Sequence, residues 1–151
     1  MNPQAEELKQ RTKRFALNVL AVVRTLPATD EARDVGGQLR RAATGAASNY
    51  RATCRSRSDA EFVAKIGNAL EEADESGFWL EVIVEGRIST GKRAVELLDE
   101  ANQLSAIFAQ SRITATERLN APGKSMTKVS AEIEKLKMEV ANLKSLVNQK
   151  S

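Results

Sequence analysis

The chain has 151 residues, of which 23 are basic and 20 are acidic, so its formal net charge is +3. This length suits one domain with an appendage, and a domain of this size can bury a core without disulfides or metals. Histidine is absent and Cys54 is the only cysteine. This composition excludes a histidine-based triad, a histidine metal ligand and a disulfide within one chain.

The first residues and the hydropathy predict a soluble cytoplasmic protein. The chain opens on polar and acidic residues, whereas a secretory signal has a basic segment followed by an apolar one. No apolar run approaches the ~20 residues that cross a bilayer. A single thiol is typical of a reducing compartment. We therefore expect no membrane partner, and we expect neither a metal nor a cofactor.

Apolar and small residues recur in alternating steps of three and four along four segments, which is the spacing of one helical face. Asn2, then Thr29 or Asp30, and then Ser58 are expected to cap the first three helices, and Glu61 completes a capping box with Ser58. These features predict an all-α, antiparallel up-down four-helix bundle over residues 1–119. The expected buried positions are Leu8, Thr12, Phe15, Val19, Val22, Leu26, Val35, Leu39, Ala42, Ala46, Asn49, Thr53, Phe62, Ile66, Ala69, Ala73, Gly77, Leu80, Val84, Ala94, Leu97, Ala101, Leu104, Phe108, Ser111 and Ala115.

A heptad-repeat helix is expected in residues 126–151, after a linker over residues 120–125 that contains Pro122-Gly123. β-Branched residues fall at heptad position a and leucines at d, a combination that favours two parallel strands. Acidic side chains occupy position g and lysines occupy e. An added tag is the alternative origin of this segment. The expected coiled-coil residues are Ile133, Leu136, Val140, Leu143 and Val147.

Arginines gather on one side of the second helix and continue into the turn that follows it. At ~100° per residue, most of them lie within about 60° of one another and away from the buried stripe. Their charge and planar fork suit contacts with backbone phosphates. The alternative is pairing with Glu71, Glu72, Glu75 and Glu81 of the same subunit or of a neighbour. The predicted nucleic-acid-binding residues are Arg33, Arg40, Arg41, Arg51, Arg55 and Arg57.

Two other features have a structural and a functional interpretation. The acids around Glu71 lack the histidine that carboxylate sites in bundles normally include, and they point in different directions, so we predict no metal site. Cys54 lies beside the buried stripe and is expected to pack there. The alternative is a reactive thiol whose pKa is lowered by Arg51 and Arg55.

The end of the third helix is apolar on nearly every side. Phe78 and Val82 point away from the stripe that contains Leu80, and Trp79 lies at its edge. A helix that is apolar all round needs a cover beyond its own bundle, and a second subunit supplies one. Local cover from the turn at Ile88 is the alternative. The predicted subunit interface consists of Leu17, Phe78, Trp79 and Val82.

Several segments of the chain carry a family resemblance: residues 2–9, 11–16, 40–42, 48–52, 55–62, 71–76 and 78–81. In them the chain resembles a bacterial four-helix-bundle family whose founding members are encoded by intervening sequences in 23S ribosomal RNA genes. The resemblance extends over residues 2–118, and it implies a ring-like homopentamer without enzymatic activity. Related accessory variability proteins of diversity-generating retroelements form basic pentamers that bind nucleic acid and a reverse transcriptase. The heptad-repeat tail departs from the family pattern.

Two functions remain open from the sequence. The first is a non-enzymatic homo-oligomeric accessory protein that binds RNA or DNA, alone or with a reverse transcriptase or another protein. The second is a scaffold that recruits a protein through its ring or its coiled-coil tail, without nucleic acid. An enzyme is not expected, because no nucleophile–base pair or ligand set is present.

Overall fold

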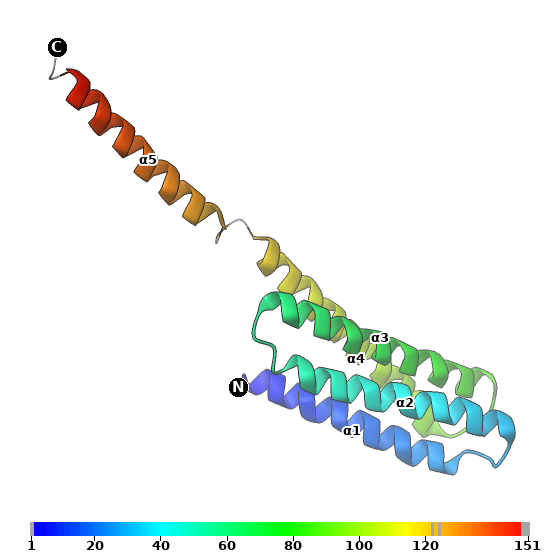
Figure 1. The fold of residues 1–151 in the computed structure, drawn as a ribbon. Coiled ribbons are helices and arrows are strands. Elements are labelled where there is room, and N and C mark those ends of the chain that lie inside the picture. Colours follow the sequence, from blue (N-terminus) through cyan, green and yellow to red (C-terminus); the bar gives the residue numbers. More distant parts are fainter. Residues whose placement is uncertain (1, 122, 124, 149–151) are drawn as a thin grey trace. The chain divides into compact units, whose positions relative to one another are not determined.

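The computed structural model describes residues 2–121, 123 and 125–148, which form five helices and no strand. The chain divides into two compact units, Met1–Leu119 and Asn120–Ser151. Consecutive helices of the first unit run antiparallel (Figure 1). The prediction of an all-α up-down bundle followed by a separate helix is confirmed. The helices are α1 (Pro3–Thr25), α2 (Asp30–Thr53), α3 (Asp59–Glu85), α4 (Lys92–Asn120) and α5 (Ser125–Asn148).

The first two helices begin at the predicted caps. Asn2 accepts a hydrogen bond from the backbone N–H of Gln4 at 3.0 Å, and Pro3 occupies the first helical position. The Thr29 hydroxyl accepts one from the N–H of Ala32 at 3.1 Å. Each cap satisfies a backbone donor that has no partner inside its helix.

The capping box at the start of α3 differs from the expected one by one residue. Ser58 accepts from the N–H of Glu61 at 3.1 Å, as predicted. The Glu61 carboxylate, however, accepts from the N–H of Arg57 at 2.8 Å, one residue before the cap. Glu61 therefore holds the basic turn between α2 and α3 against the first turn of α3.

Helix α3 ends in a Schellman motif. The N–H of Ile88 donates to the carbonyl of Ile83 at 3.0 Å, and the N–H of Arg87 donates to that of Val84 at 3.2 Å. Gly86 occupies the C-cap, with φ of −73°. The left-handed residue is Arg87, with φ of 54°. A side chain thus stands where glycine is usual in this motif.

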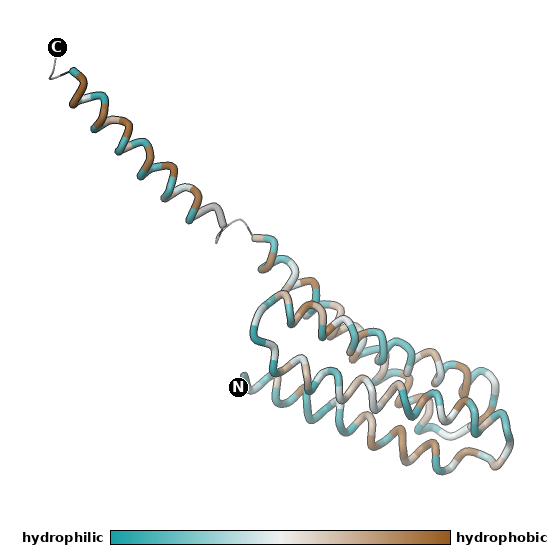
Figure 2. Tube along the Cα trace, viewed as in Figure 1, coloured by the Kyte–Doolittle hydropathy of each residue, from teal (hydrophilic) through white to brown (hydrophobic). Residues whose placement is uncertain are grey.

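The predicted stripes form the core of the bundle. Nearly all the expected positions are buried or half-buried, and Tyr50 of α2 stacks on Phe108 of α4 with ring centroids 5.1 Å apart. Ile83 is fully buried although the predicted stripe did not include it. Figure 2 shows the apolar positions along each helix. The large side chains of the core are Phe15, Val19, Leu39, Tyr50, Ile66, Leu80, Ile83, Leu97, Leu104 and Phe108.

Ion pairs connect α4 to the helices beside it. Arg11 of α1 donates from Nε to the Glu100 carboxylate of α4 at 2.6 Å. Arg118 of α4 lies 3.6 Å from the carboxylate of Asp59, at the start of α3. The partners are far apart in the sequence, so these pairs depend on the bundle being closed.

The second unit consists mainly of α5. Helix α4 continues to Asn120, one residue into the expected linker. Pro122 and residues 149–151 lie outside the described residues, and so does the side chain of Met126. Among the residues the structure describes, no helix combines the length and hydropathy needed to span a membrane.

Candidate nucleic-acid interface

The predicted arginine face lies on the outside of the bundle. We use this name for Arg33, Arg40, Arg41, Arg51, Arg55 and Arg57. All six side chains are exposed. Helix α2 ends at Thr53, so Arg55 stands with Arg57 in the turn that follows. The face therefore continues from the helix surface into the turn.

Most of this face carries uncompensated charge. Arg33 pairs with Asp30 one turn before it. Within the described part of the chain, no arginine of the face forms an ion pair with the acids of α3, so the expected alternative of pairing inside one subunit is absent. The arginines whose guanidinium groups make neither an ion pair nor a hydrogen bond there are Arg40, Arg41, Arg51, Arg55 and Arg57.

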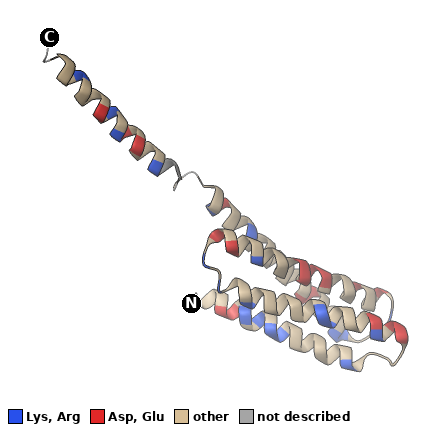
Figure 3. Cartoon of the chain, viewed as in Figure 1, with Lys and Arg blue, Asp and Glu red and all other residues tan. Residues whose placement is uncertain are grey.

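A groove between α1 and α2 adds lysines to this face. We call it the basic groove. It has a volume of about 270 Å³, and Lys9 and Lys13 of α1 line it opposite Arg51 of α2. Figure 3 shows basic residues along these two neighbouring helices. Lys9 also pairs with Glu6 at 2.7 Å. The remaining lining residues are Gln10, Ala16, Thr44, Ala47 and Ser48.

The shape and chemistry of the basic groove suit a phosphodiester backbone. Its other side chains are short or polar, so a backbone phosphate has room to approach the cations. Thr44 and Ser48 donate their hydroxyl protons to carbonyls one turn earlier, at 2.8 and 3.1 Å, so the donors that the groove offers to a phosphate are its lysines and Arg51. Lys9 and Lys13 are four residues apart on one helical face. That spacing beside the arginine face was a signal that the sequence reasoning missed.

The acids of α3 make no metal site. Among the described residues, no three cysteine or carboxylate side chains are placed to hold a metal ion together. Glu72 instead packs against α2 at Gly45. Burial raises the pKa of Glu72, and the neighbouring charges of Glu75 and Glu71 raise it further. The negative charges of Glu71, Glu72 and Glu75 therefore repel one another.

The single cysteine is not activated by the arginines near it. Cys54 is half-buried, and Tyr50 lies one helical turn before it. Burial raises the pKa of the Cys54 thiol, and its interaction with Tyr50 opposes this shift only in part. Burial also raises the pKa of Tyr50. These directions favour the packing interpretation over the reactive thiol.

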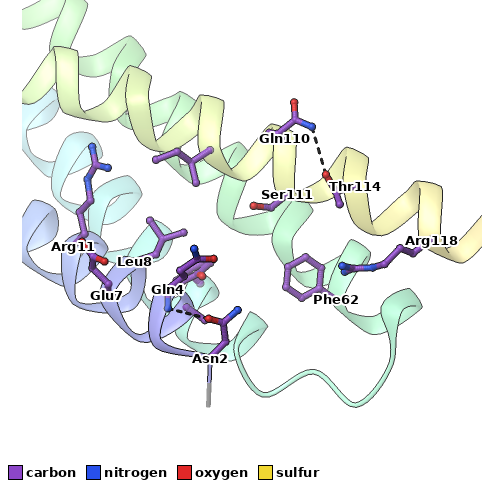
Figure 4. Close-up of a pocket in the computed structure, with 13 residues that line it drawn as sticks. Asn2, Gln4, Glu7, Leu8, Arg11, Phe62, Gln110, Ser111, Thr114 and Arg118 are labelled. Atoms are coloured by element: carbon purple, nitrogen blue, oxygen red, sulfur yellow. Dashed lines mark hydrogen bonds between the residues drawn. The ribbon is translucent and has the colours of Figure 1, made fainter.

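A larger open groove lies at the end of the bundle where α1 begins and α4 ends. It has a volume of about 620 Å³, and Tyr50 and Phe62 form part of its wall. Figure 4 shows its polar side chains, including Arg11 and Arg118. Both cations are already paired, Arg11 through two nitrogens to Glu100 and through one to Gln103. This groove therefore offers less available positive charge than the basic groove.

The predicted interface residues stand at the surface of the single chain. Leu17 is 54% exposed and Phe78 is 53% exposed, whereas Trp79 and Val82 are half-buried. Trp79 packs edge-on against Phe78 with centroids 4.9 Å apart, and its Nε1 donates to Glu75 at 3.2 Å. About half of the Phe78 side chain is therefore in contact with water in the single chain.

Comparison with known proteins supplies a family. Residues 5–110 match the family of 23S rRNA-intervening sequence proteins. A search of curated proteins finds no match. A crystal structure from Bacteroides thetaiotaomicron, described as a protein with unknown function from the S23 ribosomal protein family, superposes with a TM-score of 0.64 at 21% identity. The alignment covers 70% of this chain and 97% of that one, which supports the fold alone.

Proposed function

Because this chain belongs to the 23S rRNA-intervening sequence protein family, we propose that it is a non-enzymatic, homo-oligomeric accessory protein that binds nucleic acid. The ligand is structured RNA or an RNA–protein complex, held through phosphates at the basic groove and the arginine face. The observation that carries this proposal is the meeting of Lys9 and Lys13 with Arg51 in one groove, beside arginines without acidic partners in the described chain.

The physical chemistry favours phosphate contacts over base recognition. Phosphate binding needs cations on an accessible surface, and it releases counterions as it forms. Base stacking needs exposed aromatic rings among the cations. Tyr50 is the aromatic residue nearest the arginines in the sequence, and it is buried against Phe108. We therefore expect weak sequence preference and strong dependence on salt.

The test is a comparison of two double variants with equal loss of charge. Lys13→Gln with Arg51→Gln removes two cations of the basic groove. Arg24→Gln with Arg93→Gln removes two exposed cations outside both the groove and the arginine face. Binding of a labelled hairpin RNA, an unstructured RNA and a DNA duplex is measured by fluorescence anisotropy across a salt series. Circular dichroism verifies the fold of each variant.

The groove variant should bind every probe about tenfold or more weakly. The slope of log K against log salt should fall by about 1.4 to 1.8, since each lost phosphate contact removes about 0.7 to 0.9. The control variant should keep most of the slope. Equal losses in the two variants would show that net charge alone attracts the nucleic acid, and would overturn the assignment to the groove.

The scaffold function remains the second candidate, because α5 presents a stripe of exposed apolar side chains. In that case a protein, such as a reverse transcriptase or another helical partner, is the ligand of the particle. A homopentamer is the assembly that we propose for the bundle in either case. If the groove variant keeps its fold and binds all three probes as the wild type does, the result would contradict nucleic-acid binding at the groove and favour the scaffold function.

A further inference from the structure

Helix α5 exposes a continuous apolar stripe. Between Val129 and Val147 the apolar side chains that recur with heptad spacing are 46 to 67% exposed. Figure 2 shows apolar positions recurring along this helix. A helix with such a stripe and no partner leaves apolar area in water, which marks an interaction surface. The question is which occupant fits it.

The residues of the stripe fit a second helix of the same kind. Ile133, Val140 and Val147 occupy position a, and Leu136 and Leu143 occupy position d. β-Branched residues at a with leucine at d pack best as two parallel strands. The flanking e positions are lysines, which oppose the burial that a larger bundle would impose on them.

The charges beside the stripe select the orientation of the pair. Glu132 and Glu139 occupy position g, and Lys137 and Lys144 occupy position e. In a parallel, in-register pair, each g residue faces the e residue of the next heptad on the other strand, so Glu132 meets Lys137 and Glu139 meets Lys144. In an antiparallel pair, g faces g and e faces e, which places like charges together.

The single helix leaves these charges available. Lys137 lies 3.0 Å from Glu134 on its own helix, but both side chains are exposed, so that pair contributes little. Within the described residues, Glu132, Glu139 and Lys144 form no ion pair. A partner strand with the same sequence supplies the missing opposite charge at each of them.

We propose that α5 binds α5 of a second copy of this chain, in a parallel, in-register, two-stranded coiled coil. This interaction is independent of nucleic-acid binding, since it uses none of the cations of the basic groove or the arginine face. The paired helices span roughly three heptads, which is short for an isolated coiled coil. The pair therefore forms between chains that are held together or concentrated.

Disulfide trapping in the full chain tests both the pairing and its orientation. Each variant carries Cys54→Ser, so that the introduced thiol is the only one. Ile133→Cys and Val147→Cys are placed separately at two a positions, 14 residues or ~21 Å apart along the helix. Met138→Cys at the outward f position is the matched control. Covalent dimers are quantified on gels after mild oxidation.

In a parallel pair, identical a positions face each other. Ile133→Cys and Val147→Cys should each form dimers with themselves, at least about tenfold faster than Met138→Cys. A Leu143→Cys variant, at a d position, is also mixed with Ile133→Cys. In an antiparallel pair position a faces position d, so dimers that form only in this mixture would show that orientation and overturn the proposal. Equal rates for the a and f positions would show random collision and would also overturn it.

The charges are tested by reversal and rescue in the Val147→Cys background. Lys137→Glu with Lys144→Glu places acid against acid at the g–e contacts, and trapping should fall about tenfold. Adding Glu132→Lys and Glu139→Lys restores opposite charges and should restore trapping. Loss without rescue would mean that the lysines act through something other than the partner's glutamates, which contradicts the proposed register.

Discussion

Glu72 of α3 lies directly over Gly45 of α2. A Cβ atom built on Gly45 would stand 2.8 Å from the carboxylate carbon of Glu72. Because Gly45 has no side chain, the carboxylate of Glu72 can pack between α2 and α3. The same contact explains the raised pKa of Glu72, because burial is its largest cause.

Three glycines of α2 should respond differently to alanine. At Gly37 a new Cβ meets nothing closer than 3.7 Å, so Gly37→Ala should raise the free energy of unfolding by up to about 1 kcal/mol. At Gly45 it displaces only the mobile end of Glu72, so the gain should be smaller. At Gly36 it meets Leu26 at 3.0 Å and Val23 at 3.2 Å, and stability should fall by about 1 kcal/mol.

Urea unfolding followed by circular dichroism measures the free energy of unfolding of the three alanine variants. Gly37→Ala serves as the control for helix propensity, since its new Cβ atom would make only ordinary van der Waals contacts, with the side chains of Arg40 and Arg41. A Gly36→Ala variant as stable as Gly37→Ala would contradict the close approach of α1 and α2 at that point.

Replacing Glu72 with glutamine should stabilise the protein at neutral pH. The folded-state pKa of Glu72 is raised, so the wild-type carboxyl favours folding when protonated and loses this advantage as pH rises through the folded pKa. Glu72→Gln keeps an uncharged side chain at every pH. Its urea midpoint should therefore exceed that of the wild type at pH 7, and the difference should shrink below pH 4.5, the ordinary value for this group.

Glu81→Gln is the matched control for that experiment, since Glu81 is an exposed acid on the same helix. A gain of the same size in both variants would indicate a general effect of charge on α3. That result would contradict a specific role for the burial of Glu72 beside Gly45.

Arg87→Gly should stabilise the end of α3. Arg87 has φ of 54°, a left-handed conformation that costs a side-chain-bearing residue about 1 kcal/mol and that glycine adopts freely. We expect a gain of about 0.5 to 1 kcal/mol in the free energy of unfolding. Arg87→Ala removes the same charge but keeps the Cβ atom, so it should bring no such gain. Thermal unfolding of the two variants separates the backbone effect from the charge.

The bundle itself is expected to assemble. A chain that ends at Leu119 should remain multimeric by light scattering at micromolar concentration. Phe78→Asp should weaken that assembly by roughly 10- to 100-fold, since burying a side chain of this size contributes about 1.5 to 3 kcal/mol. Its exposure in the single chain means that the subunit fold should survive.

Ile113→Asp supplies the control for assembly, because Ile113 is 51% exposed on α4 and lies outside the predicted interface. It should leave the particle mass unchanged. A monomeric chain ending at Leu119 would contradict an interface within the bundle and would leave α5 as the element that joins the subunits.

The sequence by itself determined the helices, their caps and the buried stripes. Asn2, Thr29 and Ser58 each bond to a backbone N–H two or three residues further on, so their roles depend on local spacing alone. The heptad pattern of α5 is equally local. These features follow from helical periodicity, which is the same wherever the helix lies.

Only the tertiary structure decided what the helix surfaces meet. It placed Lys9 and Lys13 across a groove from Arg51, and in the part of the chain that the structure describes it left the arginine side chains of the face without an ion pair to the acids of α3. It also packed the Glu72 side chain of α3 against Gly45 of α2. Such contacts join residues more than 25 positions apart, and they depend on how closely and in which rotation two helices pack. Small side chains at the helix crossings determine how closely the helices approach. Charged side chains of different helices therefore come together only when the bundle has folded.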